Sequence, residues 1–201
     1  IMKQVNIVLS GIGGQGILTL ASILGTAAVI EGYDVRVAEV HGMAQRGGSV
    51  VCFVKMGEKV SSPLVMEGSA DMIISLELSE TLRVLQYLKP KKGLVVMNSN
   101  ALPPPISMIL GLQYPSLEAV LEELKSIAED VYAVNAYEIA KKIGSPQSTN
   151  MVMLGSAWAT GRLALSEQSI VKALSKTFRG DAVKINQKAF EEGAKVVKKL
   201  L

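Results

Sequence analysis

One stretch near the beginning of the chain decides the predicted fold: Asn6-Ile7-Val8-Leu9-Ser10-Gly11-Ile12-Gly13-Gly14-Gln15-Gly16-Ile17. An apolar run breaks into glycines and then resumes as a helical pattern, so the stretch predicts a strand, a tight turn and a helix. Gly11, Gly13 and Gly16 have the spacing G-x-G-x-x-G, in which glycines allow a sharp turn and a close approach of the backbone to a phosphate. Because the first amides of a helix favour an anion, this segment, the glycine loop (residues 11–16), is a candidate anion site.

The composition is that of a folded globular protein. The chain has 201 residues, of which 49% are hydrophobic and 19% are charged, so it can bury a substantial core. Its formal net charge is only +3 and comes mostly from lysines near the C-terminal end, a pattern typical of a solvated helix face. We therefore expect no nucleic-acid partner.

Cysteine usage and hydropathy suggest the compartment. Cys52 is the only cysteine, which excludes an intrachain disulfide and any iron–sulfur site built from this chain alone. Its apolar neighbours predict a buried thiol that acts as a small hydrophobic residue. The sequence shows neither a signal peptide nor an uncharged segment suited to cross a bilayer, so we expect a cytoplasmic protein without a membrane partner.

Up to about residue 145 the apolar pattern alternates between strands and helices. We expect strands over 5–10, 35–40, 49–56, 70–76, 94–98 and 131–134, and helices over 16–30, 79–88, 116–128 and 136–143. A right-handed βαβ crossover should lay the second strand beside the first. The third strand follows the second without an intervening helix, which favours an antiparallel pair, and a turn at Gly57-Glu58 would lead into a short return strand over 59–61.

The last third of the chain is different in kind. It predicts helices over 150–165, 166–177 and 181–201, with no strand between them. Such a helical end more often covers a sheet than forms a separate domain. We therefore predict an α/β fold with a mixed, mostly parallel sheet, formed by a single domain over 1–201 whose segment 150–201 is a helical extension packed on it.

Several kinds of catalytic centre are excluded within the chain. His41 is the only histidine, so neither a multi-histidine metal site nor a histidine pair for acid–base chemistry can form. No G-x-S-x-G elbow precedes a helix. The lysine of a P-loop is also missing, because Ile17-Leu18 follow Gly16. We predict no metal site in this chain.

A second loop, His41-Gly42-Met43-Ala44-Gln45-Arg46-Gly47-Gly48, separates the second and third strands. On the doubly wound pattern, both loops emerge at the carboxyl ends of neighbouring strands, where ligands of such sheets bind. The imidazole, amide and guanidinium groups of His41, Gln45 and Arg46 can meet a carboxylate or a phosphate, and the arginine fork suits a bidentate contact. The alternative is an ordinary connection whose glycines satisfy turn geometry.

Taken alone, the glycine loop also fits a dinucleotide cofactor. Glu39 lies roughly 20 residues beyond the glycines, where an acidic residue holds the ribose in dinucleotide-binding folds. The residues by themselves therefore leave two interpretations of the glycine loop open. It either binds NAD or a similar phosphate, or it is a tight βα turn without a ligand.

The two loops together resemble those of the gamma-type subunits of the 2-oxoacid:ferredoxin oxidoreductases. Gly13-Gly14-Gln15-Gly16 matches the family's G-x-G-G-Q-G loop, and Arg46-Gly47-Gly48-Ser49 matches R-G-G followed by a small hydroxyl residue. The segment Asn150-Met151-Val152-Met153-Leu154-Gly155 is similar to the asparagine-led helix start of the family. The resemblance covers most of the chain, and it implies three αβα layers like those of domain III of pyruvate:ferredoxin oxidoreductase.

This resemblance also implies an activity. The complex decarboxylates a 2-oxoacid oxidatively on thiamine diphosphate, passes electrons through iron–sulfur clusters to ferredoxin, and transfers the acyl group to coenzyme A. This chain lacks the G-D-G…N signature for magnesium and diphosphate, so a large alpha subunit should carry thiamine diphosphate, Mg and the 4Fe–4S clusters. The pattern from His41 to Gln45 resembles that of the members acting on arylpyruvates such as indolepyruvate, which implies a role in amino-acid catabolism.

By the same resemblance, this chain completes the active site or shapes the coenzyme A channel and is not expected to be active alone. The implied residues that complete the active site are His41, Gln45 and Arg46. The implied cofactor-binding residues, with coenzyme A as candidate ligand, are Gly11, Gly13, Gly14, Gln15, Gly16, Gly47, Gly48 and Asn150. The alternative functions are a free-standing NAD-binding oxidoreductase or regulator and a purely structural subunit. For the isolated chain, a second copy of itself is a candidate partner, which would give a homodimer.

Overall fold

A computed structural model describes residues 4–41, 47–101, 111 and 113–199. Its strands form one mixed sheet in the order β2-β3-β1-β4-β5-β6. The strands are β1 (Val5–Ile12), β2 (Asp34–His41), β3 (Ser49–Gly57), β4 (Met72–Ser75), β5 (Leu94–Asn98) and β6 (Asp130–Val134). Strands β1, β4, β5 and β6 pair in parallel, whereas β3 runs antiparallel to both β1 and β2. The predicted mixed, mostly parallel sheet is confirmed.

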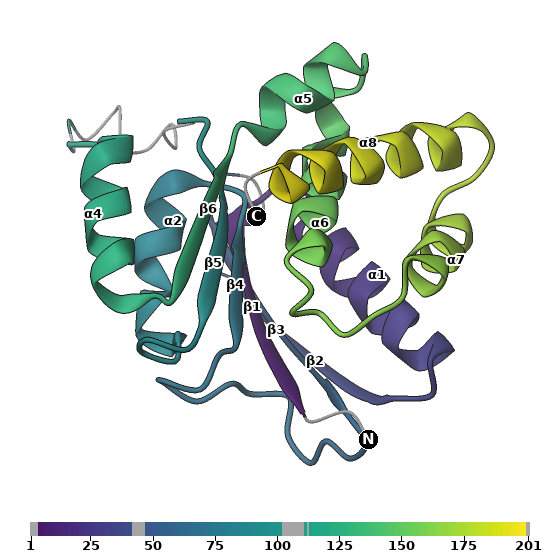
Figure 1. Cartoon of the computed structure of the whole chain (residues 1–201), viewed down its shortest axis with the longest axis horizontal. Coiled ribbons are helices and arrows are strands. Elements are labelled where there is room, and N and C mark those ends of the chain that lie inside the picture. The colour runs from purple at the N-terminus through teal and green to yellow at the C-terminus, as the bar shows by residue number, and fades with distance from the viewer. Residues whose placement is uncertain (1–3, 42–46, 102–110, 112, 200–201) are drawn as a thin grey trace.

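Helices cover both faces of this sheet (Figure 1). One face carries α1 (Ile17–Ile30), α6 (Thr149–Ala159), α7 (Glu167–Thr177) and α8 (Asp181–Lys198), and the other carries α2 (Leu78–Arg83) and α4 (Leu117–Ile127). The remaining helical segments are η1 (Leu85–Tyr87), α5 (Ala136–Lys142) and η2 (Pro146–Ser148). The predicted three layers and the covering of the sheet by the C-terminal helices are confirmed. Within the described part of the chain, no helix combines the length and apolar character needed to cross a membrane.

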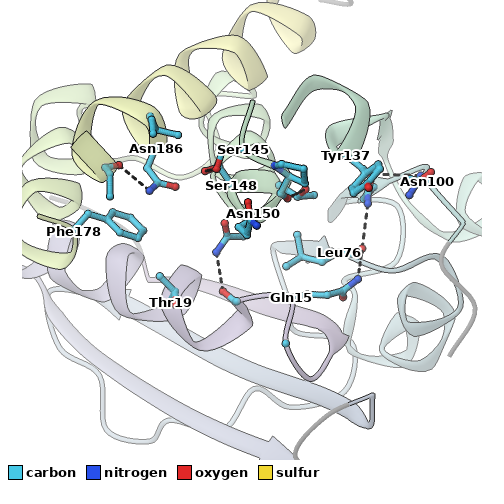
Figure 2. A pocket seen from close by; sticks show the side chains of 18 residues that line it. Gln15, Thr19, Leu76, Asn100, Tyr137, Ser145, Ser148, Asn150, Phe178 and Asn186 are labelled. Carbon is cyan, nitrogen blue, oxygen red and sulfur yellow. Dashed lines mark hydrogen bonds between the residues drawn. The ribbon is translucent and has the colours of Figure 1, made fainter. Parts of the chain in front are cut away.

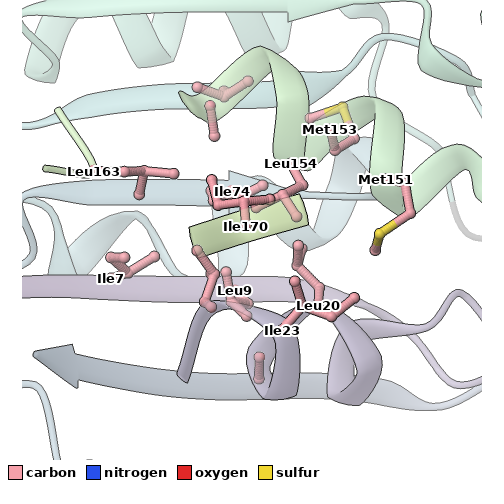
Figure 3. Packing of buried hydrophobic residues seen from close by; sticks show 14 of the residues in the cluster. Ile7, Leu9, Leu20, Ile23, Ile74, Met151, Met153, Leu154, Leu163 and Ile170 are labelled. Atoms are coloured by element: carbon pink, nitrogen blue, oxygen red, sulfur yellow. The ribbon is translucent and has the colours of Figure 1, made fainter. Parts of the chain in front are cut away.

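Alternation along the central strands divides the core into two clusters. Ile7 and Leu9 of β1 face α1 and the C-terminal helices, while Val8 between them packs with the residues under α2 and α4. Figure 3 shows Leu9 close to Leu20 of α1 in the first cluster. Because α1 lies between the sheet and the C-terminal helices, it is apolar on nearly every side and contains no charged residue.

Two details of the predicted topology are wrong. Strand β2 does not lie beside β1, because β3 is inserted between them and pairs with both. The return strand over 59–61 does not form, since a hairpin partner needs a free edge and both edges of β3 are already occupied. Instead, the backbone N–H of Val60 donates a 3.0 Å hydrogen bond to Oδ2 of Asp34.

Helix α8 is held against α6 by a close backbone crossing. A Cβ atom added to Gly155 of α6 would lie 1.8 Å from the carbonyl oxygen of Phe190. A Cβ atom added to Gly193 of α8 would lie 2.0 Å from the carbonyl oxygen of Val152. The hydroxyl of Ser156 shares its one proton between two carbonyl oxygens, that of Val152 at 2.9 Å and that of Gly193 at 3.1 Å. Only glycine fits at the two crossing positions, so the layer above the sheet depends on them.

We predict that Gly155→Ala and Gly193→Ala each lower the free energy of unfolding by roughly 3 kcal/mol, because the helices must separate to admit the methyl group. Gly25→Ala in α1 is the matched control, since its methyl group would meet Val35 and Val37 at 3.6 and 3.8 Å, which is ordinary contact. The control should leave stability unchanged or raise it by up to about 1 kcal/mol.

Denaturant titration of the isolated chain measures all three variants. The single-domain prediction for 1–201 expects one cooperative transition in each case. Equal effects of Gly155→Ala and Gly25→Ala would contradict the close crossing.

Candidate functional site

The glycine loop connects the end of β1 to the start of α1. Gly14 has φ = +103° and Gly16 has φ = +80°, backbone conformations that other residues rarely adopt. Among the described residues, apart from its two chain neighbours, no atom lies within 4 Å of a Cβ atom placed on Gly14, so this part of the structure leaves the backbone there open to an approaching group. Within the ranges that the structure describes, no side chain caps the N-terminus of α1, and its first turn contains no acidic residue. The amides of this turn are therefore available to an anion.

The side chain of Gln15 stabilises the glycine loop through two hydrogen bonds. Its Oε1 accepts a 2.9 Å hydrogen bond from the backbone N–H of Ile12, and its Nε2 donates to the carbonyl of Leu76 at 3.3 Å. A Cβ atom on Gly11 would lie 2.6 Å from that same Oε1. Gly11 thus leaves room for the Gln15 side chain, which ties the loop to the residue after β4.

Asn150 holds the other end of the loop. Its Nδ2 donates a 3.2 Å hydrogen bond to the carbonyl of Gly16, across 134 residues of sequence (Figure 2). The asparagine is 5% exposed, and a Cβ atom on Gly16 would lie 2.4 Å from its Nδ2. The structure therefore brings Asn150 at the start of α6 to the glycine loop.

The glycine loop and the end of the second loop are joined through their backbones. The N–H of Gly13 donates a 2.8 Å hydrogen bond to the carbonyl of Gly48, and the N–H of Gly47 donates a 3.2 Å hydrogen bond to the carbonyl of Gly13. His41 is exposed at the end of β2, where it pairs with Val50. Gln45 and Arg46 lie outside the described residues. The loops meet although β1 and β2 are not neighbours, because β3 begins at the end of the second loop and lies beside β1.

A pocket of about 510 Å³ opens beside the glycine loop, within the size range of small-molecule sites (Figure 2). Its walls come from the glycine loop and α1, the ends of β4 and β5, α5, the segment entering α6, and the region from the end of α7 into α8. The lining residues are Gly14, Gln15, Gly16, Thr19, Leu76, Asn98, Asn100, Tyr137, Ser145, Pro146, Gln147, Ser148, Thr149, Asn150, Phe178, Ala182, Ile185 and Asn186.

The described residues that line this pocket carry no charge, and most of the lining surface is apolar. Amides and hydroxyls supply its hydrogen-bonding groups. The N-terminus of α6 also borders the pocket, again without an acidic residue in its first turn. An anion placed here would meet neutral donors and the positive ends of two helix dipoles. Phe178, Ile185 and Tyr137 add apolar surface.

Sequence reasoning identified only part of this pocket. Asn98 ends β5, so the rule that ligands gather at the carboxyl ends of parallel strands could have found it. Its side chain accepts from the N–H of Ala136 at 3.1 Å and donates to the carbonyl of Leu76 at 3.3 Å. Phe178 and Asn186 carry no such signal, because only the packing of α7 and α8 brings them to the pocket.

Glu39 does not occupy the position of a ribose ligand. In the strand register it lies opposite Cys52, which in turn lies opposite Leu9 of β1. Its strand is therefore two places from β1, about 10 Å at the usual strand spacing, rather than one. It is also exposed at the sheet edge, away from the glycine loop.

The predicted burial of Cys52 is confirmed, because its exposed fraction is 0%. Burial, with a smaller contribution from the charge of Glu39, raises the pKa of this thiol to about 12. Since a thiolate is the form that ligates metals, Cys52 is not suited to hold a cluster. Across the described ranges, no group of three or more histidine, cysteine, aspartate or glutamate residues is placed to hold a metal ion.

Comparison with known protein families matches residues 6–196 to the pyruvate ferredoxin/flavodoxin oxidoreductase family. The chain belongs to this family. A relative from Thermococcus kodakarensis, the indolepyruvate oxidoreductase subunit IorB, is 43% identical over 206 residues, covering 100% of this chain and 99% of the relative. The resemblance read from the two loops is thereby confirmed.

Solved structures of similar fold include complete subunits and parts of longer chains. The gamma subunit of a keto/oxoacid ferredoxin oxidoreductase from Geobacter sulfurreducens matches with a TM-score of 0.70 at 22% identity, covering 96% of this chain and 98% of that chain. A 2-oxoglutarate:ferredoxin oxidoreductase from Magnetococcus marinus, described with 2-oxoglutarate, coenzyme A and succinyl-CoA bound, matches with a TM-score of 0.76 at 20% identity. That match covers 100% of this chain and 32% of the other. At these identities the likeness shows the fold.

We predict that Asn150→Ala lowers the free energy of unfolding by about 1 kcal/mol, since the carbonyl of Gly16 loses the bond from Nδ2 and keeps the bond from the N–H of Leu20. It should also speed hydrogen exchange in the first turn of α1. Asn186→Ala is the control, because among the described residues this pocket asparagine bonds only within its own helix, where its Nδ2 donates to the carbonyl of Ala182 at 2.9 Å. Equal acceleration of exchange in α1 by both variants would contradict the bracing role of Asn150.

Proposed function

We propose that this chain is the gamma-type subunit of a 2-oxoacid:ferredoxin oxidoreductase and completes its active site and coenzyme A channel. The observation that carries the proposal is the joining of the glycine loop to Gly47-Gly48 beside an uncharged pocket, in a chain that belongs to this family over residues 6–196. Neither loop alone would support it.

In the proposed reaction a 2-oxoacid loses carbon dioxide, its acyl group forms a thioester with coenzyme A, and the electrons released reduce ferredoxin. Thiamine diphosphate, Mg and 4Fe–4S clusters would belong to a large alpha subunit. The buried, high-pKa Cys52 does not fit cluster ligation. The contribution of this chain is to bind and orient the acyl acceptor, and the chain is inactive without its partner.

Coenzyme A is the proposed ligand of the pocket. Its phosphates would lie against the open backbone at Gly14 and the uncapped N-terminus of α1. Gly11, Gly13, Gly16, Gln15 and Asn150 would shape this cradle, with Gly47 and Gly48 closing one side. The description of the Magnetococcus marinus enzyme with coenzyme A and succinyl-CoA bound supports this choice of ligand.

His41, Gln45 and Arg46 are proposed to face the active site of the large subunit, where Arg46 would contact a carboxylate or phosphate. Indolepyruvate or another arylpyruvate is the proposed substrate. Support comes from the pattern between His41 and Gln45 and from the name of the relative that is 43% identical.

The free-standing NAD-binding alternative is less well supported. Its ribose ligand, Glu39, lies on a strand separated from β1 by β3. None of the described residues that line the pocket offers a carboxylate in its place.

Co-expression with the large subunit tests the proposal. We predict a stable complex that reduces ferredoxin only when a 2-oxoacid and coenzyme A are both present, with kcat/KM for indolepyruvate at least about tenfold above that for pyruvate, a difference of ~1.4 kcal/mol. Arg46→Ala should lower turnover without changing the Tm of the complex. Arg36 is an exposed arginine paired with Asp34, and the control variant Arg36→Ala should leave turnover unchanged.

A preference for pyruvate would overturn the substrate assignment alone. A subunit that does not join the large chain, or that reduces NAD with a hydroxy acid by itself, would overturn the proposed function.

A further inference from the structure

A buried carboxylate outside the pocket is connected to the two loops. Glu80 of α2 is 2% exposed. Its Oε2 accepts a hydrogen bond from the hydroxyl of Ser49 at 2.5 Å, and its Oε1 accepts from Nε of Arg83 at 3.1 Å. These bonds offset the cost of burying the charge, and one of them reaches the residue that directly follows Gly48.

We propose that Glu80 is a positioning residue that acts through Ser49 to hold the glycine loop in its binding geometry. The inference rests on the proposed function, since the geometry matters through the acyl acceptor that the loop would bind. Neither Glu80 nor Ser49 lines the pocket itself.

The connection from Glu80 to the glycine loop is short. Ser49 is the first residue of β3 and lies opposite Ile12, the last residue of β1. Its neighbour Gly48 accepts the hydrogen bond from the N–H of Gly13. A shift of Ser49 therefore moves the acceptor that fixes the first turn of the glycine loop.

The first turn of α2, which carries Glu80, is itself fixed by hydrogen bonds to Glu77. Glu77 is 0% exposed, and its Oε2 accepts a hydrogen bond from the N–H of Glu80 at 2.9 Å. The hydroxyl of Tyr114 donates to the same carboxylate. This cap fixes the first turn of α2, from which Glu80 reaches β3.

Ser79 provides a matched control for Ser49. Each is a partly buried serine whose hydroxyl donates to a buried glutamate at the start of α2. Ser49 donates to Glu80, and Ser79 donates to Oε2 of Glu77 at 2.6 Å. The Ser79 bond stays within α2, whereas the Ser49 bond joins α2 to the loops. A purely structural role would make Ser49→Ala and Ser79→Ala alike in every functional measurement.

The test uses the assembled complex and the variants Ser49→Ala, Ser49→Thr and Ser79→Ala. Ser49→Ala should raise KM for coenzyme A about fivefold, the equivalent of one ordinary hydrogen bond, and leave KM for the 2-oxoacid unchanged. Ser49→Thr keeps the hydroxyl and should restore KM to within about twofold, while Ser79→Ala should leave KM for coenzyme A unchanged.

Hydrogen exchange of the Gly13 amide in the isolated subunit gives a readout that does not depend on activity. Ser49→Ala should speed this exchange, and Ser79→Ala should not. Equal exchange in the two variants, an unchanged KM in Ser49→Ala, or no rescue by threonine overturns the role of Glu80. The proposed function fails separately. If the wild-type complex does not reduce ferredoxin but Ser49→Ala still speeds exchange of the Gly13 amide, the proposed function is overturned, and Glu80 remains the residue that holds the loop.

Discussion

Two backbone hydrogen bonds, between Gly13 and the Gly47-Gly48 turn, determine the geometry of the candidate site. They form because β3 begins at this turn and runs antiparallel to β1. Around them, two side chains fix the loops: Gln15 of the glycine loop ties it to the residue after β4, and the buried Asn150 ties it to α6. Glycines are needed where these side chains press on the backbone, so the motif is in large part a packing requirement.

The strand order argues against a dinucleotide-binding interpretation of the glycine motif. In a dinucleotide-binding fold the second strand lies beside the first and supplies an acidic residue to the ribose. Here β3 takes that place, and Glu39 is exposed at the sheet edge. The pocket beside the loop has neutral donors and two helix N-termini, which suit the phosphates of a ligand, and the described residues that line it carry no charge.

Local patterns in the sequence predicted much of the fold. The buried strands, the apolar helix α1 and the helical C-terminal third follow from periodicity, and the antiparallel third strand follows from the missing crossover helix. The insertion of β3 between β1 and β2 could not be predicted, because it depends on which strand edge is free. The glycine loop and Asn150 were found from motifs, but Phe178, Asn186 and Glu80 reach the site only through tertiary packing.

The most direct test of the central claim is hydrogen–deuterium exchange of the assembled complex with and without coenzyme A, and with NADH as the comparison ligand. Binding at the joined loops predicts that coenzyme A slows exchange in segments 12–20, 47–49 and 145–150, while NADH leaves them unchanged. Protection of these segments by NADH, or no protection by saturating coenzyme A, would contradict the account.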